Sequence, residues 1–437
     1  MRVLYVAAGI PVPGTVGGST HVREVSRGLA ALGHEVLVIA GPPRRRDAAP
    51  AIEIAAKGSL RLATKSACAD WARDPVPTRG GGFRGERSEP LAAVSTAGAA
   101  AVVTVALPKA LALGLYPVVA RRAAAFRPDV VMERYYNFAG AGLLYARWHS
   151  LGGVLEVNAP LYDPPGSPKD RLDRALGRPL RCWAAWQARA AGRIVTPLAT
   201  TVGRLAPAEK IVELPWGANT DLFDPARVGP GERADVRREL GIPDDARVVA
   251  FAGSFRPWHG VGALLAALRE LLPRDPDLWA LLLGDGPERP GLERAARGWG
   301  AAGRRVVFAG RRPYDEVPRY LAAADVGAAP FEPARHPALR HFGFYWSPLK
   351  VFEYGAMALP VVCPDLPPLN QIVRDGREGR LYREGDPAAL AAALAALLGD
   401  GAGRRALGAA ARERVVRHYS WMAHCRALAE TLRCAAR

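Results

Sequence analysis

Short apolar runs rich in β-branched residues recur along the chain and alternate with longer segments of helical periodicity. The first five runs cover residues 2–8, 35–41, 129–134, 153–159 and 193–197. Six further runs cover residues 210–217, 247–253, 279–286, 305–310, 326–331 and 359–364. Continuous apolar strands separated by helices are typical of parallel sheets that helices cover on both faces. Two such series predict two doubly wound α/β domains that face each other across a cleft.

The length of 437 residues suits two domains of about 200 residues each. Because Gly, Pro and Asp gather within 205–245, we place the first domain at 1–208 and the second at 209–412. Residues 413–437 form C-terminal helices that break near Tyr419–Ser420. Residues 43–95 are rich in Arg, Gly and Pro and predict a mobile basic insertion. The Ala-rich segment 99–120 contains a lysine and two prolines, which favour a strand plus a helix, or a helix pair, over a membrane span.

The formal net charge of +17 predicts an anionic partner. No compact basic run with interleaved aromatic residues occurs, which argues against nucleic acid and leaves a phosphate-bearing substrate or an anionic membrane surface. Five cysteines form no CxxC pair, as expected of reduced thiols in a cytosol. Met1 leads directly into an apolar strand without a signal peptide. We therefore expect a cytoplasmic protein, either free or peripheral on the inner membrane face; the pattern leaves the oligomeric state open.

In doubly wound domains, ligands bind in the loops that follow the strands. The loop after the first strand contains Gly17 and Gly18, and a helix follows with Ser19 or Thr20 as its expected cap and His21 in its first turn. Free amides at that helix start would hold an anion or a sugar hydroxyl. The alternative is a flexible loop with a surface histidine. The GxGxxG dinucleotide fingerprint is absent from this sequence.

The loop after residues 247–253 combines Gly253, Ser254, Arg256 and His259 with a helix that opens at about Gly260. Cationic side chains and helix amides at one strand end predict a pyrophosphate site. The alternative is a basic turn that buries its tryptophan.

Two further loops have the composition of a nucleotide site. Gly284 and Gly286 surround Asp285, so this loop either lets a nucleotide approach the backbone or forms a tight turn. Arg311 and Arg312 follow the next strand and would lie over a base.

The segment "SPLKVFEYGAMALPVV" places Lys350 and Glu353 on one helical face, with Pro348 in the first turn and Ser347 as the expected cap. A lysine suits a phosphate, and a carboxylate accepts hydrogen bonds from two vicinal hydroxyls. Phosphate and diol together indicate a nucleoside diphosphate. The alternative is an exposed salt bridge between the two side chains.

Metal motifs are weak in this sequence. Asp275 and Asp277 form a DxD pattern, but the pair precedes a strand and predicts a turn. HExxH, GxSxG and GxxxxGK[ST] do not occur, and we expect no catalytic metal.

In their order and spacing these segments resemble the retaining glycosyltransferases of GT-B fold in family 4, also called group 1. The resemblance rests on the Gly-Gly-x-x-His loop, "FAGSFRPWHG", "LLLGDGP", "VVFAGRRPYDEVPRYLAAADV", "SPLKVFEYGAMALPVV" and the terminal "HYSW". It implies two Rossmann-like domains, with the last helix crossing back to the N-terminal domain. It also implies a UDP-, GDP- or ADP-sugar donor in the C-terminal domain, a small-molecule acceptor in the N-terminal domain, and no required cofactor.

The resemblance carries over to individual residues. It implies a ribose-binding Glu353, and a diphosphate site at Arg256 and His259 with Lys350 nearby. The implied catalytic residues are Arg256, His259, Lys350 and Asn158. The implied donor contacts are Gly17, Gly18, Gly253, Ser254, Gly284, Asp285, Gly286, Arg311, Arg312, Tyr345, Ser347, Leu349 and Glu353. The implied acceptor contacts are His21, Glu133, Tyr135 and Glu156. The family's Glu-x7-Glu pair would require Glu at 345, where this chain has Tyr345.

The mechanism that the resemblance implies is a metal-independent front-face substitution, in which the leaving diphosphate accepts the proton of the acceptor. Two alternatives stay open: a non-catalytic nucleotide-sugar-binding protein, and a sugar-nucleotide epimerase on the same fold.

Overall fold

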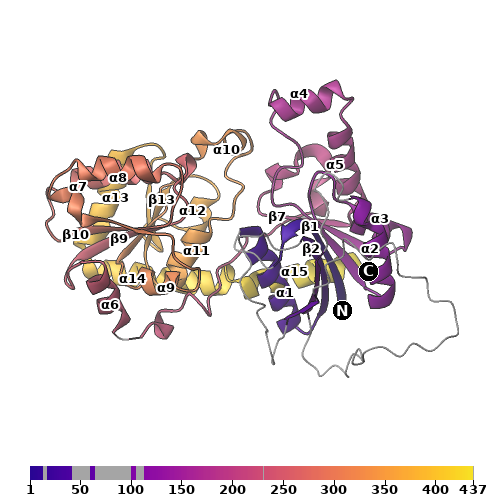
Figure 1. The fold of residues 1–437 in the computed structure, drawn as a ribbon, viewed down its shortest axis with the longest axis horizontal. Helices are drawn as coiled ribbons and strands as arrows, with labels where there is room; N and C mark the ends of the chain where they lie inside the picture. Colours follow the sequence, from indigo (N-terminus) through magenta and orange to yellow (C-terminus); the bar gives the residue numbers. More distant parts are fainter. Residues whose placement is uncertain (13–16, 42–59, 64–99, 105–112, 230, 437) are drawn as a thin grey trace. The chain divides into compact units, whose positions relative to one another are not determined.

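The computed structural model describes residues 1–12, 17–41, 60–63, 100–104, 113–229 and 231–436. The chain forms two compact units (Figure 1). The N-terminal unit comprises Met1–Leu214 and His424–Arg437, and the C-terminal unit comprises Pro215–Ala423. Most of the segment 43–95 lies outside the described residues.

The N-terminal unit is built on a parallel sheet whose described strands have the order β3-β4-β2-β1-β5-β6-β7-β8. The strands are β1 (Arg2–Pro11), β2 (Glu35–Gly41), β3 (Leu60–Ala63), β4 (Ala100–Thr104), β5 (Val130–Arg134), β6 (Gly152–Glu156), β7 (Arg193–Thr196) and β8 (Ile211–Glu213). The helices are α1 (Gly17–Ala31), α2 (Tyr116–Phe126), α3 (Ala141–Trp148), α4 (Pro168–Ala175), α5 (Pro179–Ala190) and α15 (Trp421–Ala436). Strands β2 to β4 lie on one side of β1, and strands β5 to β8 lie on the other. The carboxyl ends of β1 and β5 therefore form the topological switch point of this sheet.

Helices cover both faces of this sheet. Leu4 and Val6 of β1 pack with Val119 of α2 and Tyr145 of α3 in one core cluster. On the other face α15 lies beside α1, where Cys425 Sγ is 3.9 Å from the Glu24 carbonyl oxygen. The final helix therefore packs on the N-terminal unit, as expected. The predicted break is also confirmed, because α14 (Gly401–His418) ends just before Tyr419.

One predicted strand joins the other sheet. The run at 210–217 was expected to begin the second series, but β8 pairs with β7 in the N-terminal sheet, with Ile211 opposite Ile194. An apolar run indicates that a strand is buried, but it does not specify which strand it pairs with. The expectation that residues 210–217 begin the second sheet was therefore wrong. The Ala-rich segment 99–120 contains β4 and the start of α2. Among the described residues, no helix is long and apolar enough to cross a membrane.

The C-terminal unit has a second parallel sheet, with the order β11-β10-β9-β12-β13-β14 among its described strands. The strands are β9 (Arg247–Ala252), β10 (Leu278–Leu283), β11 (Val306–Gly310), β12 (Val326–Ala328), β13 (Val361–Pro364) and β14 (Gly379–Tyr382). The helices are α6 (Glu232–Glu239), α7 (Val261–Leu271), α8 (Arg289–Arg297), α9 (Val317–Leu321), α10 (Pro337–Phe342), α11 (Leu349–Ala356), α12 (Leu369–Ile372), α13 (Pro387–Gly399) and α14. Its strand order reverses between β9 and β12.

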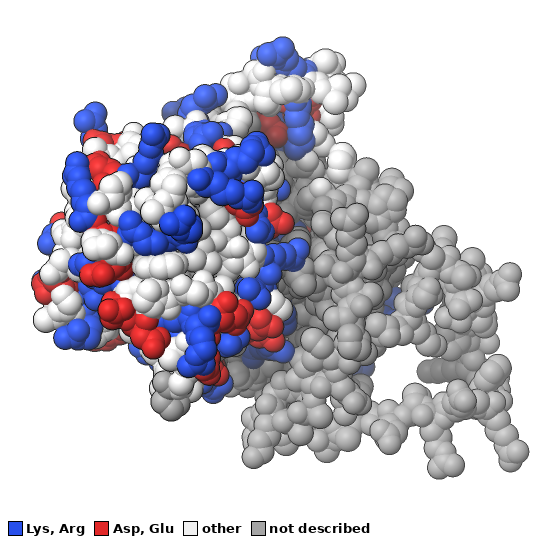
Figure 2. Space-filling view, turned by 60° about the vertical axis from the view of Figure 1, so that its left-hand side comes forward, with Lys and Arg blue, Asp and Glu red and all other residues white. Residues whose placement is uncertain are grey.

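Two helical layers enclose the C-terminal sheet. Helices α7, α8 and α13 lie on one face, and α6, α9 and α14 lie on the other (Figure 1). Leu264 and Leu268 of α7 and Leu394 of α13 share a core cluster with the apolar side chains of β9 and β10. On the face of this unit that Figure 2 shows, basic side chains are spread widely and acidic side chains lie among them. The excess positive charge therefore forms no single continuous basic area on that face.

Candidate functional site

The carboxyl end of β9 lies at the switch point of the C-terminal sheet. Gly253 follows β9 with a φ of 150°, a conformation that favours glycine. A Cβ atom at this position would lie 2.9 Å from Lys350 Nζ. The α11 lysine thus reaches the backbone that follows β9, although about a hundred residues separate the two in the sequence.

Lys350 is buried without a hydrogen-bonding partner. Its side chain is 6% exposed, and Nζ has no partner among the described residues. Nζ lies 3.9 Å from the ring centroid of Phe251 and 4.8 Å from that of Phe331. Burial lowers the pKa of Lys350 to about 7, while Glu353 opposes this shift. Because an ammonium has three donors, this site has hydrogen-bonding capacity that an anionic ligand would satisfy.

Glu353 lies one turn farther along α11 and is also buried. Burial raises its pKa to about 7, against a hydrogen bond from Tyr314 and the charge of Lys350. Both side chains of the predicted pair are inside the protein, so the alternative of an exposed salt bridge is wrong.

The loop after β9 brings Ser254 to His259. Ser254 Oγ lies 3.2 Å from His259 Nδ1. Burial, followed by Lys350 and Arg256, lowers the pKa of His259 to about 2. The histidine is therefore a neutral hydrogen-bonding group and not the cation that the sequence suggested. Arg256 is exposed, and its guanidinium lies 5.4 Å from the ring centroid of Trp258.

The glycines of the β10 loop have a packing role. A Cβ on Gly284 would lie 1.8 Å from the Gly253 carbonyl oxygen, and one on Gly286 would lie 2.7 Å from the Phe255 amide nitrogen. The Phe255 amide also donates to the Asp285 carbonyl oxygen at 3.0 Å. These glycines let the β9 and β10 loops approach each other, which accounts for them without a nucleotide.

Four other predicted donor residues differ in their surroundings. Arg312 is 3.5 Å from Glu239 and stacks on a tyrosine ring, whereas Arg311 is exposed. Ser347 does not cap α11; its Oγ accepts a hydrogen bond of 2.9 Å from the Trp216 amide. Leu349 is half-buried.

Tyr345, at the position where the family pattern requires Glu, is 5% exposed. Its ring lies 5.8 Å from that of Trp346 and 6.4 Å from that of Phe342. Burial raises the pKa of its hydroxyl. The side chain is thus part of an aromatic cluster in the loop that precedes α11.

A buried polar cluster occupies the switch point of the N-terminal sheet. Glu156, at the end of β6, accepts a hydrogen bond of 2.6 Å from the Tyr5 hydroxyl and one of 3.3 Å from Arg134 Nη1. The other Glu156 oxygen lies 2.9 Å from His21 Nε2. All four side chains are below 10% exposed. Together they join β1, β5, β6 and α1.

The hydrogen bonds of this cluster define its protonation. Arg134 Nη1 lies 2.9 Å from His21 Nδ1, and because a guanidinium can only donate, Nδ1 accepts and Nε2 carries the proton toward Glu156. Burial lowers the pKa of His21 despite Glu156, which agrees with a neutral imidazole. Burial alone would raise the pKa of Glu156, but His21, Arg134 and Tyr5 hold it well below its usual range. Glu156 is therefore a stable carboxylate.

The glycines of the first loop lie in the first turn of α1, which begins at Gly17. A Cβ on Gly18 would lie 3.3 Å from Ile10 and 3.7 Å from Arg134 Nη2. Ser19 is a buried residue inside the helix, so the expected cap at Ser19 or Thr20 is wrong. The polar cluster thus underlies the first turn of α1.

The remaining predicted residues of this unit have mixed roles. The Glu133 carboxylate accepts hydrogen bonds from the amides of Gly140 at 2.7 Å and Leu143 at 2.8 Å, so it anchors the start of α3 and is not free for an acceptor. The Tyr135 hydroxyl donates to the Leu161 carbonyl oxygen at 2.9 Å. Asn158 follows β6 and is half-buried.

Two residues of the polar cluster were missed from the sequence. Tyr5 is hidden in an apolar strand and gives no sequence signal. Arg134 is the last residue of β5, and a charged residue at the end of a buried strand was a signal that could have identified it.

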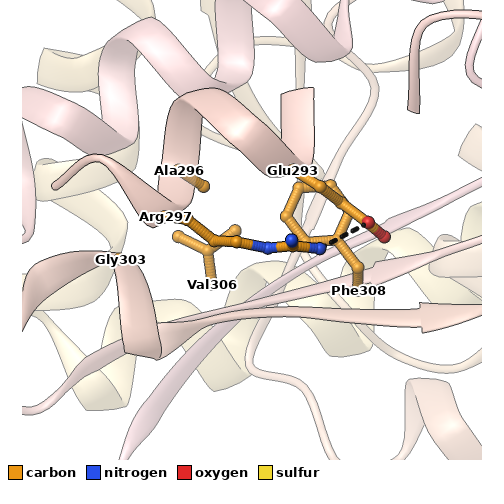
Figure 3. A pocket seen from close by; sticks show the side chains of 6 residues that line it. All are labelled: Glu293, Ala296, Arg297, Gly303, Val306 and Phe308. Atoms are coloured by element: carbon orange, nitrogen blue, oxygen red, sulfur yellow. Dashed lines mark hydrogen bonds and ion pairs between the residues drawn. The ribbon is translucent and has the colours of Figure 1, made fainter. Parts of the chain in front are cut away.

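Outside these clusters, the described residues form no metal site, but they line a cavity. The described residues contain no group of three or more His, Cys, Asp or Glu side chains placed to hold a metal ion. A cavity of about 230 Å³ lies among α8, β11 and the short helix η7 (Ala302–Arg305). In Figure 3 the Arg297 side chain, which lines the cavity, extends toward Glu293, and Arg297 Nη2 lies 3.2 Å from a Glu293 carboxylate oxygen. No predicted site residue lines it.

Comparison with known proteins agrees with this architecture. Residues 246–400 match the family model described as Glycosyl transferases group 1. The D-inositol 3-phosphate glycosyltransferase of Nocardia farcinica is 35% identical over 232 residues, which cover 49% of this chain and 48% of that protein. The GDP-mannose-dependent alpha-(1-6)-phosphatidylinositol monomannoside mannosyltransferase of Mycolicibacterium smegmatis is 32% identical over 226 residues, covering 52% and 57%. The chain spans about half the length of the curated relatives that it matches.

Among solved structures, HepE of Anabaena in complex with UDP has a TM-score of 0.65 at 17% identity, covering 99% of this chain and 100% of that one. At this identity the likeness concerns the fold. The two parallel-sheet units and the C-terminal helix on the N-terminal unit agree with the GT-B fold that the resemblance implied. Residues 246–400 are therefore similar to a group 1 glycosyltransferase domain, within a chain that has the fold of the GT-B glycosyltransferases.

Proposed function

We propose that this protein is a retaining glycosyltransferase that uses a nucleoside diphosphate sugar and requires no metal ion. The observation that carries the proposal is Lys350: a buried ammonium without a hydrogen-bonding partner, at the switch point of the group 1 domain. A buried cation without a partner is costly to the fold, and such groups gather at functional sites. A diphosphate supplies the anionic partner that this site lacks.

The neighbours of Lys350 support a division of roles for the donor. Lys350 and the neutral His259 donate to the diphosphate, with Ser254 orienting the imidazole. Glu353 accepts hydrogen bonds from the two ribose hydroxyls. Arg256 is exposed and can turn toward the phosphates when the donor binds.

The proposed chemistry is a front-face substitution at the anomeric carbon. The bond from this carbon to the leaving phosphate oxygen breaks, and the acceptor hydroxyl forms its new bond on the same face of the sugar. A diphosphate oxygen takes the proton of that hydroxyl, and the Lys350 ammonium stabilises the negative charge that develops. A single contact of this kind typically lowers the barrier by about 2.7–4 kcal/mol.

The donor base and the acceptor follow from the relatives as proposals. One relative is named for GDP-mannose, and a similar structure holds UDP, so both bases belong in the first donor panel. Both curated relatives are named for substrates that contain a phosphorylated inositol. We propose such a compound, bound by the N-terminal unit, as the first acceptor class to test.

The test is a transfer assay with UDP-, GDP- and ADP-sugars and a panel of phosphorylated inositols, in buffer with and without a chelator. We expect one donor to yield a product of retained anomeric configuration by NMR, without loss of rate in the chelator. Lys350→Met should lower kcat/KM at least a hundredfold. Donor binding without transfer to any acceptor would favour a nucleotide-sugar-binding protein, and a changed sugar without acceptor would favour an epimerase.

A further inference from the structure

Helix α4 is an exposed element at the end of the N-terminal unit. In Figure 1 it lies beyond α5, away from the sheet. None of its eight residues is buried. Leu172 and Leu176 are 60% and 65% exposed, although they are large apolar side chains. Burial within its own unit therefore does not explain these leucines.

The spacing of residues along α4 separates the leucines from the acidic residues. At 100° per residue, Pro168, Leu172 and Leu176 share one side of the helix. Lys169 and Arg171 fall on the two borders of this apolar side. The helix therefore has an apolar face with a basic residue on each edge.

The two acidic residues of α4 are used within the fold; Asp170 lies opposite the apolar side, and Asp173 lies beside Lys169 at its edge. The Asp170 carboxylate accepts a hydrogen bond of 2.7 Å from the Gly166 amide. The Asp173 carboxylate accepts one of 2.8 Å from the Leu180 amide and so anchors the start of α5. The first bond holds the turn before α4, and the second holds the α4–α5 corner.

Further basic residues continue beyond the helix. Arg178 is the residue before α5 and Arg181 lies in its first turn, and both are exposed. Lys169 pairs with Asp163 at 2.9 Å, but side chains that are 43% and 35% exposed gain little from such a pair. Arg171 Nε donates to the Gly166 carbonyl oxygen at 2.9 Å, and the Arg181 guanidinium lies 5.1 Å from the Tyr162 ring centroid. Because a guanidinium has five N–H donors, both exposed side chains keep donors for an anionic surface.

We propose that α4 and its turn into α5 form a docking surface for an anionic lipid bilayer. Leu172 and Leu176 enter the boundary between headgroups and acyl chains, while Arg171, Arg178 and Arg181 contact lipid phosphates. A helix with an apolar face, a polar face and low mean hydropathy is typical of elements that lie in this boundary. The proposal does not depend on the proposed transferase activity.

Two features of α4 favour a bilayer over a protein partner. The basic residues on its edges complement anionic lipid headgroups, which occur at any point of such a surface. A ridge of two leucines, Leu172 on α4 and Leu176 at its C-cap, is also much smaller than the roughly 800 Å² that each partner buries in a stable protein interface. An extended lipid surface requires no matching groove.

The experiment is vesicle flotation of the full chain at low salt. The two vesicle types are phosphatidylcholine alone and phosphatidylcholine with phosphatidylglycerol. We expect binding to the anionic vesicles only. Leu172→Ser with Leu176→Ser should weaken this binding at least tenfold, which corresponds to about 1.4 kcal/mol, because both variants remove apolar surface that the bilayer would bury. Arg178→Gln should weaken it about fivefold, which corresponds to ~1 kcal/mol for one basic residue near the surface.

The matched controls lie on the C-terminal unit. Val416 is 43% exposed, and the side chain of Arg238 is 75% exposed. Val416→Ser and Arg238→Gln should leave vesicle binding unchanged, and all variants should keep the wild-type melting temperature.

Three results would overturn the proposal. One is no binding to anionic vesicles by the wild-type chain. Another is equal loss in the α4 variants and in their controls, since that would indicate a general effect of charge. The third is a lipid-free dimer in light scattering that the leucine pair variant abolishes, because the ridge would then serve a second copy of the chain.

Discussion

Replacing Lys350 by Met should stabilise the protein and abolish its binding of diphosphate. Burial lowers the pKa of this lysine from 10.5 to about 7. At 1.36 kcal/mol per pH unit, the charged ammonium costs the folded state up to about 5 kcal/mol. Methionine has a similar length and packs well against the rings of Phe251 and Phe331. The variant removes this cost without leaving a cavity.

The net gain will be smaller than this upper limit. Glu353 loses its neighbouring cation in the variant, and its own pKa, already raised to about 7, rises further. We expect a gain of about 2 kcal/mol in the free energy of unfolding at pH 7, within the range for replacement of buried charges by apolar groups. For a unit of this size that gain raises Tm by ~5 °C.

The pH dependence of the gain tests its cause. Because the pKa of Lys350 is lower in the folded state, the cost is fully present below pH 7 and disappears as the pH rises to 10.5, where the unfolded lysine is also neutral. The stability advantage of the variant should therefore be largest near neutral pH and shrink across this window. Urea unfolding of both proteins between pH 7 and 10 measures it.

Lys210→Met is the matched control. Lys210 Nζ donates to the carbonyl oxygens of Arg189 and Ala191, so its replacement should give no gain in stability. Calorimetry with UDP and GDP provides the functional measurement, in which Lys350→Met should lose binding and Lys210→Met should keep it. A Lys350 variant that is no more stable than the wild type, or that binds a nucleoside diphosphate as tightly, would refute the reasoning.

Three further variants test the two sites. Glu353→Gln should weaken nucleoside diphosphate binding about tenfold, since hydrogen bonds to a charged group contribute ~1.5–3 kcal/mol. Pyrophosphate affinity in calorimetry should fall less, because this ligand loses only the support that Glu353 gives to the charge of Lys350; an equal loss for both ligands would contradict the ribose role. Glu156→Gln should cost about 3 kcal/mol in urea unfolding at pH 7, because it leaves Arg134 buried without its carboxylate. In the wild type this stabilisation is present above pH 4.5 and is lost as the pH falls further, since the pKa of Glu156 is lowered; wild-type stability in the variant would argue against it. Gly284→Ala should lower Tm strongly, because its Cβ would lie 1.8 Å from a carbonyl oxygen, whereas Gly262→Ala, with nothing within 4 Å, should gain about 0.5–1 kcal/mol; similar Tm values for the two would speak against close loop packing.

Much of the candidate site was predictable from residue types in strand-end loops. Lys350 and Glu353 were identified by their spacing on one helical face, His21 by its position in a loop after a strand, and Glu156 by the resemblance to a family. Their surroundings were not predictable, because burial and hydrogen-bonding partners come from other segments. Glu133 shows the limit: its sequence position resembles that of Glu156, yet its carboxylate binds the amides at the start of α3.

The sequence by itself determined the α/β class, most of the strands and the two-unit organisation, because strands buried on both faces require continuous apolar runs, and these are visible locally. Only the tertiary structure decided that β8 joins the N-terminal sheet, since an apolar run does not specify the strand with which it pairs. It also decided that Lys350 stands without a hydrogen-bonding partner beside Gly253 and that Arg134 completes a buried cluster. Charge and burial at these positions depend on residues that are distant along the chain, and folding alone brings them together.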